Sequence, residues 1–166
     1  MQGPQPLPAA PSRPDPQGLT AGITRGVCRL FWLSGFAPVR EVTLANGRRA
    51  DVLGVNPKGT LWIAEVKTSR ADLLGDCKWP AYRDFCDAFL WAVPEDLAPL
   101  LDAPAFLPEE AGLVVADAHG AALVRPPVAR PLAAARRRAV TLALARTAAE
   151  RAHRLADPGF EGFAAR

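Results

Sequence analysis

The sequence predicts an α/β protein with a mixed central sheet, in the order helix, three strands, helix, strand, hairpin and helix. Three observations predict this class: apolar residues at helical spacing near the N-terminus, short β-rich runs separated by turn residues in the middle, and an alanine-rich segment with few breakers at the end. The 166 residues are expected to comprise a disordered tail with six prolines, residues 1–18, and a single domain, residues 19–166.

The first helix is predicted to begin at Thr20, which suits the N-cap position, and to end before Gly35. Its apolar residues between 23 and 31 recur every three or four positions, which indicates one buried face. Residues 38–69 then read as three short strands joined by two turns, one at Asn46-Gly47 and one at "NPKG", residues 56–59. This pattern predicts a β-meander.

A second helical region is predicted after Ser69, which can cap it, and Pro80 either divides this region into two helical pieces or kinks one helix. The run "FLWAV", residues 89–93, is apolar throughout, as is typical of a central buried strand. Two short runs within residues 112–125 predict a final hairpin, and residues 131–156 predict a long terminal helix. The hairpin and the terminal helix are thus additions to an αβββαβ core.

The segment "LWIAEVKTS", residues 61–69, places two charges on a face that should be buried. Because side chains alternate along a strand, Glu65 and Lys67 share the face that Leu61 and Ile63 commit to the interior. Either this strand end leaves the core as a solvated ion pair, or it opens into a site that uses both charges.

Asp51 interrupts an apolar face of the preceding strand in the same way. A plain turn at residues 56–59 would pair Asp51 with Ala64 and turn it away from Glu65. A one-residue bulge at Gly59, which tolerates positive φ, would place Asp51 opposite Glu65 on the same side of the sheet. The "NPKG" sequence permits this bulge, and cross-strand neighbours are then roughly 5 Å apart at Cβ.

Two facing carboxylates and a main-chain carbonyl are oxygen ligands that suit Mg²⁺ or Mn²⁺. Such an ion keeps several waters and accepts phosphate oxygens as further ligands. A lysine two residues along the same face can orient or help deprotonate an attacking water, or stabilise charge that develops on the phosphate. Asp51, Glu65 and Lys67 are therefore the candidate catalytic residues.

The motif and the order of elements resemble a known superfamily. Asp51, a turn and then Glu65-Val66-Lys67 are similar to the D…ExK core of the PD-(D/E)XK nucleases, and the αβββαβ order is similar to their restriction-endonuclease-like fold. More closely, "GRRADVLGV", "AEVKTSRADLLGDCKWPAYRDFCD" and "AGLVVADAHGAALVR" resemble the MmcB family of small bacterial proteins classed with DNA repair. This likeness covers residues 20–155.

The resemblance implies metal-dependent phosphodiester cleavage by Asp51, Glu65 and Lys67, with Mg²⁺ or Mn²⁺ held by the two carboxylates and the Val66 backbone carbonyl. Many relatives take a further acidic ligand from the first helix, which has no acid here. Glu41, in the first strand, is the predicted substitute. The position before Asp51 is alanine rather than proline, which is a common variation.

The net charge of +3 is unevenly distributed along the chain. Residues 125–154 carry eight arginines and one acid, a charge of +7 that leaves −4 for the rest. This asymmetry is expected of a nucleic-acid contact, and equally of a solvated basic helix face. The residues predicted to contact DNA are Arg70, Lys78, Arg136, Arg137 and Arg138.

Two functions from different classes are compatible with these features. The first is a metal-dependent DNA endonuclease or exonuclease in repair, which the intact trio of Asp51, Glu65 and Lys67 favours. The second is a non-catalytic DNA-binding or scaffolding module that retains the nuclease fold. The expected partner is structured or damaged DNA, and both a homodimer and a complex with another repair protein remain open.

The sequence also excludes several classes. No run approaches the roughly 18 apolar residues of a membrane span, and the N-terminus lacks a secretory signal, so a cytoplasmic protein without a membrane partner is expected. The three cysteines have no paired spacing, which predicts reduced thiols rather than disulfides or a structural zinc site.

Overall fold

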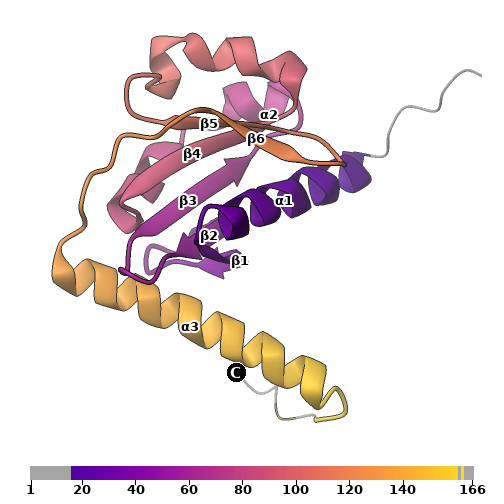
Figure 1. Ribbon diagram of the computed structural model, residues 1–166, viewed down its shortest axis with the longest axis vertical. Coiled ribbons are helices and arrows are strands. Elements are labelled where there is room, and N and C mark those ends of the chain that lie inside the picture. The colour runs from indigo at the N-terminus through magenta and orange to yellow at the C-terminus, as the bar shows by residue number, and fades with distance from the viewer. Residues whose placement is uncertain (1–15, 161, 163–166) are drawn as a thin grey trace, which may run out of the picture.

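Six strands form one mixed sheet in the order β1-β2-β3-β4-β5-β6 (Figure 1). The computed structural model describes residues 16–160 and residue 162. β1, β2 and β3 are antiparallel, β3, β4 and β5 are parallel, and β6 returns antiparallel to β5. The predicted mixed sheet and final hairpin are therefore confirmed. The strands are β1 (Ala37–Thr43), β2 (Arg49–Val55), β3 (Leu61–Val66), β4 (Ala88–Val93), β5 (Gly112–Ala116) and β6 (Ala121–Arg125).

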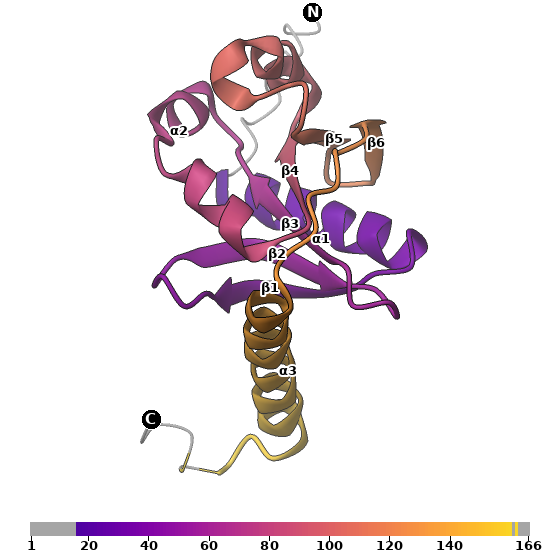
Figure 2. The same ribbon diagram turned by 90° about the vertical axis from the view of Figure 1, so that its left-hand side faces the viewer.

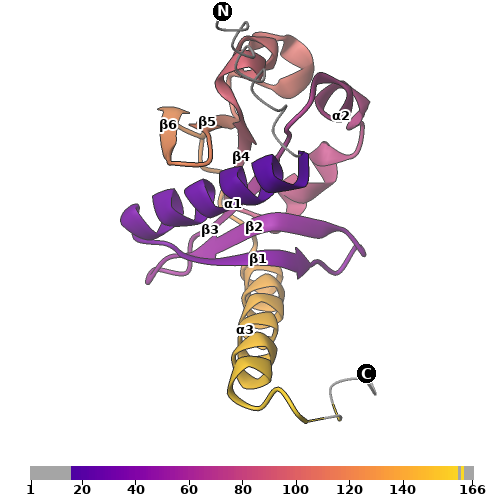
Figure 3. The same ribbon diagram turned by 90° about the vertical axis from the view of Figure 1, so that its right-hand side faces the viewer.

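Helices cover both faces of this sheet. Helix α1 crosses one face, as Figure 3 shows, while the shorter helices lie on the other side. No helix in the described part of the chain is both long and apolar enough to span a membrane. The helices are α1 (Pro16–Leu33), α2 (Arg70–Gly75) and α3 (Ala134–Ala156), with the 3₁₀ segments η1 (Trp79–Phe85), η2 (Glu95–Asp102) and η3 (Pro104–Phe106).

Helix α1 begins four residues before its predicted start. Residues 16–18, which were expected in the proline-rich tail, are helical, and the rest of that tail lies outside the described residues. Pro16 is compatible with the first helical turn, where a backbone N–H has no intrahelical partner. Thr20 is consequently inside the helix rather than at its cap, and its hydroxyl lies 3.3 Å from that of Thr68, just after β3.

The predicted apolar face of α1 packs on the sheet. Ile23, Val27 and Phe31 are fully buried against strand residues that include Val52 and Ala64. The approach is close, because a Cβ atom built at Gly54 of β2 would lie 2.6 Å from the Phe31 ring. A side chain at this strand position would therefore push α1 away from the sheet.

Strand β4 is the central strand that "FLWAV" predicted. All six of its residues are buried, because β3 and β5 flank it and both of its faces are covered. Trp91 packs edge to face against Trp79 of η1 and Phe106 of η3. This aromatic cluster anchors the loop between α2 and β4, which carries part of the candidate site.

The second helical region consists of two pieces, one of the two predicted alternatives. The Ser69 hydroxyl accepts a hydrogen bond from the Asp72 N–H at 3.2 Å and caps α2, as expected. Pro80 occupies the start of η1, where it needs no N–H donor. Trp79 and Tyr82 are buried in the core.

Helix α3 begins at Ala134 and is joined to the sheet by a buried ion pair. Asp87 is 4% exposed, and its carboxylate accepts hydrogen bonds from Arg137 at 2.5 and 2.7 Å and from the Leu61 and Leu132 N–H groups. Val140 and Leu144 are buried in the same cluster as residues of β1. Further along the helix, the Arg151 side chain still reaches backbone carbonyls of β1, while the helix as a whole projects beyond the edge of the sheet (Figure 2).

Candidate functional site

The turn at residues 56–60 sets the register of the site. Gly59 has a φ of +79°, and Asn56 and Thr60 close the turn through a backbone hydrogen bond of 3.1 Å. Val55 therefore pairs with Leu61, and Val52 pairs with Ala64. This is the bulged register predicted from "NPKG", and its continuation brings Asp51 opposite Glu65.

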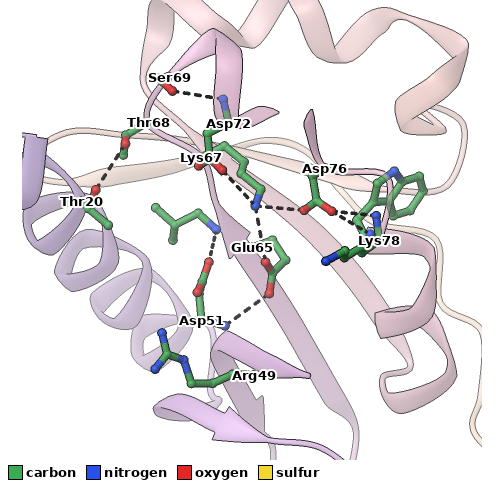
Figure 4. A network of polar contacts seen from close by, with 12 residues as sticks. Thr20, Arg49, Asp51, Glu65, Lys67, Thr68, Ser69, Asp72, Asp76 and Lys78 are labelled. Atoms are coloured by element: carbon green, nitrogen blue, oxygen red, sulfur yellow. Dashed lines mark hydrogen bonds and ion pairs between the residues drawn. The ribbon is translucent and has the colours of Figure 1, made fainter. Parts of the chain in front are cut away.

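Asp51 and Glu65 lie together on neighbouring strands, as Figure 4 shows. An Asp51 carboxylate oxygen accepts a hydrogen bond from the Val66 N–H at 2.8 Å, and a Glu65 carboxylate oxygen accepts one from the Asp51 N–H at 3.3 Å. Glu65 is only 3% exposed, and Asp51 is half-buried. Each carboxylate is thus oriented by the backbone of the neighbouring strand.

Both carboxyl groups hold their protons more tightly than in water. Burial and the neighbouring Asp51 charge raise the pKa of Glu65 to about 8, against 4.5 normally, despite the opposing effect of Lys67. Burial also raises the pKa of Asp51, although the hydrogen bond from Val66 and the Lys67 charge act in the opposite direction. Two negative charges are therefore costly here without a cation between them.

Lys67 follows β3 and lies among three carboxylates. Its ammonium nitrogen is 2.9 Å from Asp76, 3.7 Å from Asp72 and 3.9 Å from Glu65. Burial alone would lower the pKa of Lys67, but the three carboxylates outweigh it, and the pKa is raised. Lys67 is therefore a buried cation at neutral pH, placed beside the Asp51–Glu65 pair.

The donor set fits a small hard cation. The two carboxylates supply oxygen ligands with excess negative charge. The Val66 N–H group points toward β2, where it donates to Asp51. Since the N–H and C=O groups of one strand residue point to the same side, the Val66 carbonyl is the third candidate oxygen. Within residues 16–160 and 162, no three His, Cys, Asp or Glu side chains are grouped closely enough to hold a metal ion. The two carboxylates and the carbonyl would leave further ligand positions open to water or substrate oxygens.

Glu41 occupies the strand position opposite Asp51 but points to a different partner. Its carboxylate lies 3.7 Å from Arg49, and both side chains are exposed. Glu41 has a φ of +50°, and Arg151 of α3 donates a 3.1 Å hydrogen bond to its carbonyl oxygen, which holds this unusual backbone. The predicted ligand is thus adjacent to the Asp51–Glu65 pair without being joined to it.

A polar cleft of about 520 Å³ opens beside Asp51. Its walls are the first turns of α1 and the facing parts of β1 and β2. Arg40 and Arg49 lie in its lining together with Glu41 and Asp51. The candidate site therefore has an open approach lined by charged and hydroxyl side chains.

The five residues predicted to contact DNA lie in two separate places. Arg70 is exposed at the start of α2, and Lys78 is exposed just after that helix, on the side of Asp76 that faces away from Lys67 in Figure 4. Arg136 and Arg138 are exposed on α3, where the Arg136 guanidinium lies 4.7 Å from the Phe85 ring centroid. Arg137 is engaged by Asp87 instead, and its guanidinium also donates to the Gly59 carbonyl at 2.7 Å.

Asp76 and Asp87 are the polar residues whose importance sequence reasoning underestimated. The ion-pair partner of Asp76 is Lys67, nine residues away, and that of Asp87 is Arg137, fifty residues away, so neither pairing follows from local sequence. The one available signal was the position of Asp76 just before Trp79-Pro80, where a carboxylate can cap the following turn. Neither ion pair could be read from spacing alone.

Comparisons with known proteins show the family and the fold of the chain. No curated protein matches the chain significantly. A solved structure, the SPO1766 protein of unknown function from Silicibacter pomeroyi, is similar with a TM-score of 0.76 and 41% sequence identity, over 88% of this chain and 95% of that one. The model of the family described as "DNA repair protein MmcB-like" matches residues 9–159. The chain therefore belongs to the MmcB-like family of DNA repair proteins.

Proposed function

We propose that this protein is a Mg²⁺- or Mn²⁺-dependent deoxyribonuclease of the PD-(D/E)XK type that acts in DNA repair. The observation that carries the proposal is the meeting of Asp51 and Glu65 across β2 and β3 with the buried Lys67 ammonium beside them. Membership of a DNA repair family supports DNA as the substrate. The raised pKa of Glu65, about 8, supports a cation as the missing partner of the two carboxylates.

The bound ion would neutralise a phosphate and lower the pKa of a water. Asp51 and Glu65 would hold that ion, and the Val66 carbonyl would complete the protein's oxygen ligands. Lys67 donates hydrogen bonds and positive charge to the water or to the non-bridging phosphate oxygens, where negative charge accumulates. Its raised pKa favours this donor role over that of a general base.

The cleft beside Asp51 is the proposed route for the DNA strand. Its lining includes the exposed Arg40 and Arg49, which can bind phosphates next to the one that is cleaved. Lys78 lies on the other side of the site, beyond Lys67 and Asp76, and Arg70 begins α2 three residues after Lys67. A DNA backbone that passes between these two groups would bring a phosphate to the Asp51–Glu65 pair.

The proposal is tested by incubating the purified protein with gapped, flapped, branched, abasic and blunt DNA in the presence of Mg²⁺, Mn²⁺ or a chelator. At least one substrate is expected to be cut with either metal and none with the chelator. Binding of these DNAs without any cleavage would contradict the proposal and support the non-catalytic DNA-binding module instead.

DNA contacts are predicted to be strongest beside the site. Replacing Arg70 and Lys78 with glutamine should reduce the slope of log K against log salt concentration by about 1 to 2, since each phosphate contact contributes about 0.9. The Arg136→Gln/Arg138→Gln variant should have a smaller effect. The reason is distance: Arg137 and Leu61 both bind Asp87, which fixes the start of α3 near Leu61. Leu61 lies at the other end of β3, four residues and about 13 Å from Glu65 at 3.3 Å per residue.

These slopes would be measured with a fluorescent duplex and an Asp51→Asn background, so that no DNA is cut. Arg146→Gln is the matched control, because Arg146 is also exposed on α3 but faces Glu150 at 3.9 Å. An unaltered slope in the Arg70→Gln/Lys78→Gln variant would exclude these two residues from the DNA path and leave Arg40 and Arg49 as its candidates.

A further inference from the structure

Asp76 is held more rigidly than its position between two short helices would require. One of its carboxylate oxygens accepts hydrogen bonds from the N–H groups of Lys78 at 2.9 Å and Trp79 at 3.0 Å. Trp79 is itself 5% exposed, with its ring 5.3 Å from those of Phe89 and Trp91 in β4. The Asp76 carboxylate is therefore tied through Trp79 to the central strand.

The second carboxylate oxygen of Asp76 contacts Lys67. The distance to the ammonium nitrogen is 2.9 Å, whereas Asp72 and Glu65 lie at 3.7 and 3.9 Å. Among the described residues, Asp76 is thus the carboxylate within hydrogen-bond distance of this ammonium. Both side chains of the pair are 11% exposed, so water screens the contact weakly.

A lysine needs such a partner to act at a defined point. Its ammonium group is a compact charge on four flexible methylene groups, and it does not select one geometry by itself. Facing the Asp51–Glu65 pair, an unrestrained ammonium would move toward the strongest negative charge. A rigid carboxylate at 2.9 Å holds the ammonium at 3.9 Å from Glu65, where its remaining N–H groups can serve a substrate.

We propose that Asp76 is a positioning residue, which fixes the Lys67 ammonium beside Glu65 and thereby in reach of the phosphate that is cleaved. The catalytic part of this inference rests on the proposed nuclease function. The contact itself is a property of the structure that can be tested without cleavage. Asp76 need not touch the DNA.

A purely structural role for Asp76 is the competing explanation, because its first oxygen caps η1 through Lys78 and Trp79. Asp76→Asn separates the two roles. Asparagine keeps one carbonyl oxygen for the two N–H groups, while the atom that faces Lys67 becomes an uncharged amide nitrogen that can only donate. The cap is retained and the restraint on the ammonium is lost.

Asp76→Asn is expected to lower kcat for DNA cleavage by about 10- to 100-fold and to leave KM within about 2-fold, since small displacements of a catalytic group reduce the rate by such factors. Asp72→Asn is the matched control. It removes the same charge from the same helical region at 3.7 Å, but Asp72 is exposed, and kcat should change by less than about 3-fold. Equal losses in both variants would overturn the proposal.

A double variant tests whether Asp76 acts through Lys67. In a Lys67→Gln background, Asp76→Asn should have no further effect on kcat, because the group that it positions is already absent. Independent losses that multiply would assign Asp76 a separate role and overturn the inference. Should Asp76→Asn alone fail to fold, the double variant, which removes both buried charges, is expected to restore folding. Failure of both would indicate the purely structural cap.

Crystal structures of the wild type and the Asp76→Asn variant provide the readout that is independent of activity. The Lys67 ammonium is expected to leave its position beside Glu65 in the variant, with the η1 segment unchanged. An ammonium that stays in place would overturn the positioning role, whatever the activity. If the wild type cuts no DNA but the ammonium is displaced in the Asp76→Asn variant, the proposed nuclease function is refuted and the positioning of Lys67 by Asp76 stands.

Discussion

Asp51→Asn and Glu65→Gln are each expected to reduce metal-dependent DNA cleavage by at least about 10²- to 10³-fold, the scale on which loss of one pre-organised group acts. Each substitution keeps the size of the side chain and deletes a charged oxygen ligand. The fold should persist, because the amide oxygens can still accept the N–H groups of Val66 and Asp51. The metal-free melting temperature should rise slightly, since the repulsion between the two carboxylates is relieved.

Cleavage rates with Mn²⁺ and titration calorimetry with Mn²⁺ alone would check this result. Both variants should lose measurable Mn²⁺ affinity together with activity. Glu41→Gln is the matched comparison, because Glu41 lies on the neighbouring strand and faces Arg49. A smaller effect is expected there. A loss as large as that of Asp51→Asn would place Glu41 among the ligands, and unchanged cleavage by Asp51→Asn would remove Asp51 from the site.

The stability of the metal-free protein is expected to fall by about 3 to 4 kcal/mol between pH 5 and pH 8. The pKa of Glu65 is about 8 in the folded protein and 4.5 normally, so the folded state binds more protons than the unfolded state throughout this window. Stability therefore decreases as pH rises. The raised pKa of Asp51 acts in the same direction.

Other shifted groups titrate outside that window. The lowered pKa of Asp76 affects stability only at acidic pH, and the raised pKa of Lys67 only at strongly basic pH. Chemical denaturation with a chelator at pH 5, 6.5 and 8 would measure the effect. Glu65→Gln should flatten the profile, and Mn²⁺ should stabilise the wild type more at pH 8 than at pH 5, because protons compete with the ion. If the stability of the wild type does not decrease between pH 5 and pH 8, the raised pKa values of the buried Asp51 and Glu65 carboxyl groups are contradicted.

The amino-acid sequence by itself determined the strands and their turns, and it predicted that Asp51 and Glu65 could meet. Alternation predicted β2 and β3, and the glycine of "NPKG" permitted the bulged register, which the structure adopts and which brings Asp51 to Glu65. These features are predictable because strand periodicity and turn conformation depend on residues that are close in sequence. The same locality explains the correct Ser69 cap of α2 and the buried face of α1.

Only the tertiary structure decided which charges are paired. Three consecutive arginines look equivalent in the sequence, yet Arg137 is bound by Asp87 through contacts that span fifty residues, while Arg136 and Arg138 remain exposed. Lys67 is likewise held by Asp76, and Glu41 is paired with Arg49. The start of α1 at Pro16 was missed because its first turn lies in a proline-rich segment. Ion pairs have no period along the chain, and their strength depends on burial and distance, which only the packing of α2, η1 and α3 against the sheet creates.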